Sequence, residues 1–146
     1  GRPSSGPPPR WRCPPGSDRP EPVLIVDVAN VMGSRPDGWW RDRAGAAARL
    51  VTLIGAAAEA GRLGSGAGPV VGVLEGRARA AAPDVPDGVV VVRAEGSGDD
   101  AIVAATAEGR QAGAEVVVVT ADRALQARVR QLGSGVSSPR HFLDLL

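Results

Sequence analysis

The sequence is poor in the residue types that most often form chemical sites. Of its 146 residues, one is a cysteine, Cys13, and one is a histidine, His141. A single cysteine excludes an internal disulfide and any multi-cysteine zinc site. A single histidine leaves little material for a histidine-ligated zinc or a histidine-activated nucleophile. We expect His141 to be structural or exposed.

Aromatic residues and membrane-spanning runs are also scarce. Aromatic residues make up 3% of the chain, so valine, leucine, isoleucine and alanine must form the core. No apolar run is long enough to cross a bilayer, and the first residues contain no hydrophobic signal core. We therefore expect a cytoplasmic protein without a membrane partner. The net charge of +1 gives no bulk argument for an acidic partner.

Lysine is absent, and all 17 basic residues are arginines. The planar guanidinium group suits the recognition of phosphates and carboxylates. A GC-rich genome, which favours arginine, alanine, glycine and proline codons, is the simpler explanation of this bias. The arginines become informative only through their positions.

The chain has the length of one domain. Residues 1–21 are rich in proline, arginine, serine and glycine, which predicts a disordered tail, because they cannot bury enough surface to offset the entropy of ordering. Residues 22–146 alternate apolar runs with helical patterns, which predicts a three-layer, Rossmann-like α/β fold: a mostly parallel sheet of four to five strands with helices on both faces. We expect strands at 23–26, 69–75, 89–92, 116–119 and around Val136, and helices at 40–62, 76–82, 97–111, 123–132 and 139–146.

Three of the predicted strands run into acidic residues, namely Asp27, the pair Asp99 and Asp100, and Asp122. The loops after parallel strands open at one edge of the sheet, where α/β proteins bind ligands. Carboxylates that approach one another repel, and a hard divalent cation removes that penalty. The sequence therefore predicts an oxygen-ligated Mg²⁺ or Mn²⁺ site, a common device for phosphodiester hydrolysis.

Helix capping offers a competing interpretation of these acids. Asp99, Asp100 and Asp122 stand in or just before the first turn of a predicted helix, where acids bind free N–H groups. Taken singly, Asp122 and one of the Asp99 and Asp100 pair are interpreted as caps. Asp27 follows an apolar strand and has no evident capping duty. The coincidence of three strand ends favours a functional site.

Three motifs in the sequence resemble those of a known family. Asp27-Val-Ala-Asn30, Gly98-Asp-Asp-Ala-Ile102 and Thr120-Ala-Asp122 resemble the PIN-like nucleases, in particular their NYN branch of bacterial YacP-like proteins, over residues 22–146. The resemblance implies metal-dependent cleavage of RNA. It implies that the metal-site acids are Asp27, Asp99, Asp100 and Asp122. It also implies that Asn30 is the family asparagine and that Thr120 supports the last acid. Asn30 either orients a ligand or ties down its loop.

Other residues near the predicted edge are weaker candidates. Glu75 ends the second strand and is a second-rank metal ligand. For contact with single-stranded or structured RNA we single out Arg41, Arg43, Arg77, Arg79, Arg123, Trp39 and Trp40, because aromatic rings beside arginines suit stacking on unpaired bases. The competing interpretation is that one tryptophan packs against the sheet and most of these arginines are solvated.

Two rival functions remain open. One is hydrolysis of nucleoside triphosphates or other phosphate esters by the same acids, although the sequence contains no Gly-x-x-x-x-Gly-Lys-Ser/Thr phosphate loop. The other is a non-catalytic module that binds RNA or protein and uses the acids only as caps. The motifs are compatible with a monomer or a homo-oligomer.

Overall fold

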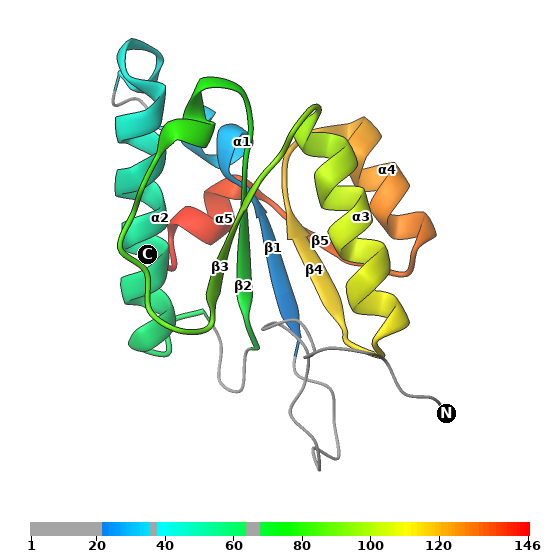
Figure 1. Cartoon of the computed structure of the whole chain (residues 1–146). Helices are drawn as coiled ribbons and strands as arrows, with labels where there is room; N and C mark the ends of the chain where they lie inside the picture. Colours follow the sequence, from blue (N-terminus) through cyan, green and yellow to red (C-terminus); the bar gives the residue numbers. More distant parts are fainter. Residues whose placement is uncertain (1–21, 36–37, 64–67) are drawn as a thin grey trace.

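The computed structural model describes residues 22–35, 38–63 and 68–146. Its centre is a sheet in which all four strand pairings are parallel, in the order β3-β2-β1-β4-β5 (Figure 1). The strands are β1 (Val23–Asp27), β2 (Val70–Leu74), β3 (Val89–Arg93), β4 (Val116–Val119) and β5 (Gly135–Ser137). The predicted strands and the parallel sheet are confirmed.

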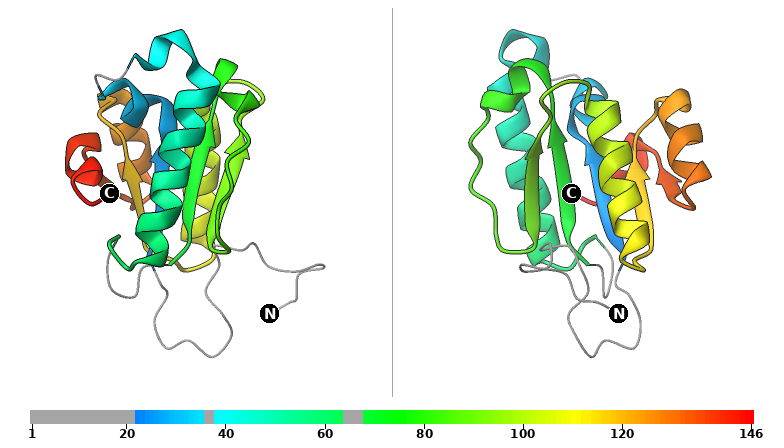
Figure 2. Two further views of the ribbon diagram at one scale, coloured as in Figure 1. Left: turned by 90° about the vertical axis from the view of Figure 1, so that its left-hand side faces the viewer. Right: turned by 45° about the vertical axis from the view of Figure 1, so that its right-hand side comes forward.

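Helices cover both faces of this sheet and make three layers (Figure 2). One face carries α1 (Val28–Gly33), α2 (Arg43–Glu59) and α5 (Pro139–Leu143), and the other carries α3 (Gly98–Gln111) and α4 (Arg123–Gln131). Two 3₁₀ turns, η1 (Trp39–Arg41) and η2 (Gly76–Ala80), lie in the connections. The three-layer α/β prediction is therefore confirmed.

The two cores follow the alternation of side chains along each strand. In β1, Val23 and Ile25 pack against α3 and α4, whereas Val26 packs against α1 and α2. Because successive side chains of a strand point to opposite faces, a strand buried on both faces reads as an unbroken apolar run. On the α1 side, Gly72 of β2 faces Val28, and a Cβ there would make ordinary van der Waals contact with Val28 at 3.5 Å.

The strand order places a topological switch point beside β1. From β1 the chain proceeds to β2 and β3 on one side, and then continues with β4 and β5 on the other. Ligands of open α/β sheets bind at the carboxyl ends of strands where the order reverses in this way. The residues that end β1 and follow β4 are Asp27 and Thr120.

Two local predictions were wrong. No helix was expected directly after Asp27, yet α1 begins at Val28. The helix expected at 40–62 is shorter, because the carboxylate of Asp42 accepts a hydrogen bond from Gly45 N (2.9 Å) and starts α2 at Arg43. The tryptophan pair consequently stands outside α2, in η1.

Some predictions fall outside the described residues. These concern residues 1–21, which include Cys13 and for which the sequence predicts a disordered tail. Within the described ranges, no helix is both long and apolar enough to cross a membrane.

Candidate active site

Asp27, the last residue of β1, has only 7% of its surface exposed. Its Oδ1 accepts a hydrogen bond from the backbone N–H of Asn30 (3.4 Å), and its Oδ2 accepts one from the hydroxyl of Thr120 (3.0 Å). Asp27 therefore caps α1, and the expectation that it had no capping duty was wrong. The error arose because the apolar pattern concealed the start of α1.

Thr120, which follows β4, connects two of the acids. Its buried hydroxyl donates to Asp27 and accepts a hydrogen bond from the backbone N–H of Asp122 (3.1 Å). A hydroxyl has only one proton to donate, so these two bonds fix its orientation. The carbonyl of Thr120 accepts a further bond from the side-chain amide of Gln126 (2.8 Å). The ends of β1 and β4 are thereby held in one arrangement.

Asn30 makes a second connection between the same two strand ends. Its side-chain oxygen accepts a hydrogen bond from the backbone N–H of Ala121 (2.9 Å). The sequence left open whether Asn30 orients a ligand or ties down its loop. This contact does the latter, because it ties α1 to the loop that leads into α4. Asp122 then caps α4 by accepting from Leu125 N (3.1 Å), as the capping interpretation predicted.

Asp99 and Asp100 occupy the first turn of α3 and point in different directions. The capping residue of this helix is Ser97, whose hydroxyl accepts from Asp99 N (3.1 Å). Successive helical residues are rotated by roughly 100°, so only one of the two acids can face the sheet edge. Asp100 lies at the surface and forms an ion pair with Arg128 of α4 (3.1 Å). Asp99 is the one near the other acids.

Glu75, which follows β2, lies close to the other acids, although the sequence placed it only second among the candidate metal ligands. Its Oε2 accepts a short hydrogen bond from Gly98 N, the first residue of α3 (2.7 Å). A Cβ on Gly98 would lie 2.7 Å from the same oxygen, so the contact needs a glycine. Glu75 is also close enough to Asp27 and Asp99 to repel both.

Burial and repulsion disfavour charge on these acids. Burial, with smaller contributions from Glu75 and Asp99, raises the pKa of Asp27 to about 6, even though the hydrogen bonds from Thr120 and Asn30 act in the opposite direction. Burial, and then the carboxylates of Asp122 and Glu75, raise the pKa of Asp99. The site is therefore short of positive charge at neutral pH.

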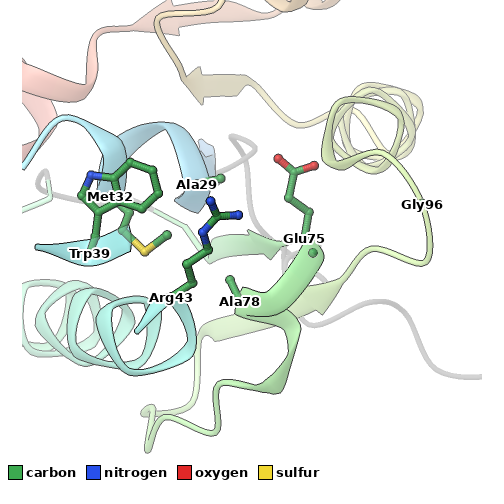
Figure 3. A pocket seen from close by; sticks show the side chains of 8 residues that line it. Ala29, Met32, Trp39, Arg43, Glu75, Ala78 and Gly96 are labelled. Atoms are coloured by element: carbon green, nitrogen blue, oxygen red, sulfur yellow. The ribbon is translucent and has the colours of Figure 1, made fainter. Parts of the chain in front are cut away.

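A pocket of about 400 Å³ lies beside this group of acids. Figure 3 shows Trp39, Arg43 and Glu75 around it, with Met32, Ala29 and Ala78. Trp39 packs against the α1–α2 core, and the guanidinium of Arg43 stands 5.5 Å from its ring centre. The sequence singled out Trp39, Arg43 and Glu75 separately, and the fold brings them to one pocket.

The remaining candidate RNA-contact residues are spread over the surface. Trp40 is 56% exposed and lies outside the pocket lining, with the Arg41 guanidinium 5.8 Å from its ring centre. Arg77 and Arg79 are exposed on η2, and Arg123 is exposed at the start of α4. These arginines surround the site without converging on one point in the described part of the chain.

Comparison with solved structures places this arrangement in a known fold. The crystal structure of a mutant of Rae1 (YacP) from Bacillus subtilis superposes with a TM-score of 0.60 over 84% of this chain and 72% of that chain, at 17% sequence identity. The chain has a YacP-like fold. The sequence matches no protein-family model and no curated protein.

The donor chemistry of this group of acids suits a hard cation. The acids are all oxygen donors, and a divalent ion would relieve the repulsion that, together with the larger effect of burial, raises the pKa of Asp27 and Asp99. Within the described ranges, however, no three acidic, histidine or cysteine side chains already lie close enough together to hold an ion. Closing three carboxylates around one would require new side-chain rotamers.

Sequence reasoning missed part of the supporting structure. Gln126, which binds the Thr120 carbonyl, was not selected, although its position four residues after the capping Asp122 was a usable signal. Met32, Ala29 and Ala78 line the pocket, but their side chains have no charged group that would mark them as site residues in the sequence. Only the fold identifies such apolar residues as part of a site.

Proposed function

We propose that this protein is a ribonuclease that hydrolyses RNA phosphodiester bonds with Mg²⁺ or Mn²⁺ as cofactor. The observation that carries the proposal is the position of Asp27. It is a buried carboxylate at the switch point of the sheet, is tied through Thr120 to Asp122, and has Asp99 and Glu75 as close neighbours. Helix capping alone would not explain why these acids are held together against their own repulsion.

Each residue has a distinct role in this proposal. Asp27, Asp99 and Asp122 would hold the ion, and Glu75 lies next to them in the lining of the pocket. Thr120 joins the carboxylate of Asp27 to the backbone N–H of Asp122, and Asn30 accepts a hydrogen bond from Ala121 N in the loop that leads into α4. When bound, the ion would activate water and stabilise the charge that develops on the phosphate oxygens. Asp100 has no role in holding the ion in this proposal, and it forms an ion pair with Arg128.

Cleavage of single-stranded RNA in the presence of Mn²⁺ tests the proposal. The variants are Asp27→Asn and Asp122→Asn, because asparagine is also a good helix cap and should preserve α1 and α4. We expect each variant to lose at least about a hundredfold in rate, since even indirect partners of metal ligands are worth ten- to a hundredfold. Asp84→Asn, at an exposed loop position, is the matched control and should cleave normally.

The same preparation separates the rival functions. Phosphate release from nucleoside triphosphates without RNA cleavage would identify a phosphate-ester hydrolase. Equal cleavage by the parent and both site variants would reveal a contaminating nuclease and contradict the proposal. Calorimetric titration that detects no Mn²⁺ binding would favour the interpretation in which the acids serve only as caps.

A further inference from the structure

The pocket beside the acids has a lining that phosphodiester hydrolysis does not require. Ala29, Met32 and Ala78 supply apolar surface, and Trp39 supplies a flat aromatic wall. Glu75 belongs both to this lining and to the surroundings of Asp27. An occupant of the pocket would therefore lie directly next to the proposed site of hydrolysis.

The charged groups of the pocket are directed toward an occupant. Arg43 extends from α2 into the pocket, and Glu75 enters from the far side (Figure 3). No ion pair joins them within the described residues. Glu75 is fixed through Oε2 by Gly98, and Arg43 stands over Trp39. The pocket thus presents a donor, an acceptor and a planar wall, which suits a flat ring with hydrogen-bonding groups on its rim.

We propose that this pocket binds one unpaired nucleobase of the RNA substrate, next to the phosphate that is cut. The inference rests on the proposed ribonuclease function and specifies its substrate as RNA with unpaired bases. Trp39 and the guanidinium of Arg43 together form the stacking surface, since both ring systems and guanidinium planes stack on bases. Glu75 accepts a hydrogen bond from the edge of the base.

Pairing of the base is incompatible with this arrangement. The edge that would meet Glu75 is occupied by the partner strand in a duplex, and the face that would meet Trp39 is covered by the neighbouring bases. Recognition by stacking is tolerant of sequence, because every base has such a face. The pocket therefore selects for an unpaired base more strongly than for a particular base sequence.

Binding without cleavage provides the test. The full chain is titrated, in EDTA, with a labelled short oligoadenylate and with an abasic ribose-phosphate oligomer of the same length, which keeps the phosphates and removes the bases. The variants are Trp39→Ala, Trp39→Phe and, as a control at an exposed apolar position outside the pocket lining, Leu53→Ala. Thermal unfolding of each variant establishes that it is folded.

We expect Trp39→Ala to weaken oligoadenylate binding on the order of tenfold, the usual effect of removing one stacking ring, and to leave abasic binding unchanged. Trp39→Phe should restore much of the loss, and Leu53→Ala should bind both oligomers as the parent does. Equal weakening of both oligomers by Trp39→Ala, or no weakening of either, would overturn the proposal.

A second measurement leaves Trp39 in place and so does not depend on the folding of a variant at that position. In a Trp11→Phe, Trp40→Phe protein, Trp39 is the only tryptophan. We expect saturating oligoadenylate, but not the abasic oligomer, to quench its fluorescence. Identical spectra with the two oligomers would contradict stacking on Trp39.

The two proposals fail separately in these experiments. If Asp27→Asn abolishes cleavage while base-dependent binding is absent, the ribonuclease stands and the base pocket is wrong. If base-dependent binding is present in EDTA while no cleavage occurs with Mn²⁺, the pocket stands as an RNA-binding site and the catalytic proposal is wrong.

Discussion

Among single residues, Asp27 combines a structural and a chemical task. Its carboxylate caps α1 and accepts from Thr120, and both contacts favour the charged form. Burial outweighs them and raises its pKa to about 6 from an ordinary value of 3.8. The residue therefore holds a charge at neutral pH at a cost to folding, as expected of a group retained for its chemistry.

This cost predicts a pH-dependent stability. The folded protein binds the Asp27 proton more tightly than the unfolded chain, so stability falls as the pH rises from about 4 to about 6 and then levels off. Above that window Asp27→Asn should be more stable than the parent by up to about 3 kcal/mol, and below it the two should converge. Urea unfolding at several pH values measures the difference.

The exposed Asp84→Asn variant is the control for this measurement, and its stability should follow that of the parent across the whole range. A constant gap between Asp27→Asn and the parent at every pH would mean that the charge of Asp27 is not the cause.

Among the secondary-structure elements, α3 is contacted at its first residue by Glu75, an acid that follows β2. Glu75 accepts a hydrogen bond from the N–H of Gly98, the first residue of α3. An acid at a helix N-terminus also complements the helix dipole. The same carboxylate repels Asp27 and Asp99, so its hydrogen bond and its charge have opposite effects on stability.

Two substitutions at Glu75 separate these effects. Glu75→Gln keeps an acceptor for Gly98 and removes the charge, whereas Glu75→Ala removes both. We expect the alanine variant to be less stable than the glutamine variant by about 1 kcal/mol, the usual worth of a capping acceptor. Chemical denaturation measures the gap. The exposed Glu95→Ala is the control, and equal stabilities at position 75 would show that the Gly98 contact contributes nothing.

For the whole molecule, the site and the fold are coupled through the proposed ion. A ligand that binds only the folded state stabilises it by mass action, about 2.7 kcal/mol at a hundredfold excess over its dissociation constant. We expect Mn²⁺ to raise the melting temperature of the parent and to leave that of Asp27→Asn unchanged. Differential scanning fluorimetry with Mn²⁺ provides the measurement, and Asp84→Asn should respond as the parent does. A similar rise in Asp27→Asn would place the ion elsewhere.

The sequence by itself determined the α/β class and the edge at which the site lies. Apolar runs alternating with helical patterns define a parallel sheet, and parallel strands bring their carboxyl ends to one side whatever their order. The sequence therefore placed Asp27, the pair Asp99 and Asp100, and Asp122 at one edge before any coordinates, without distinguishing the two members of the pair. Thr120 and Asn30 were identified by the motif resemblance, not by their pattern.

Only the tertiary structure decided which side chains meet. Asp99 and Asp100 are equivalent in sequence, yet the rotation of α3, which buries Ile102 against the sheet and brings Gly98 to Glu75, turns one toward the acids and the other toward Arg128. The cap at Asp27 and the shared pocket of Trp39, Arg43 and Glu75 likewise depend on how helices are placed on the sheet. Local patterns set where a helix runs, whereas its rotation is set by contacts with residues distant in the chain.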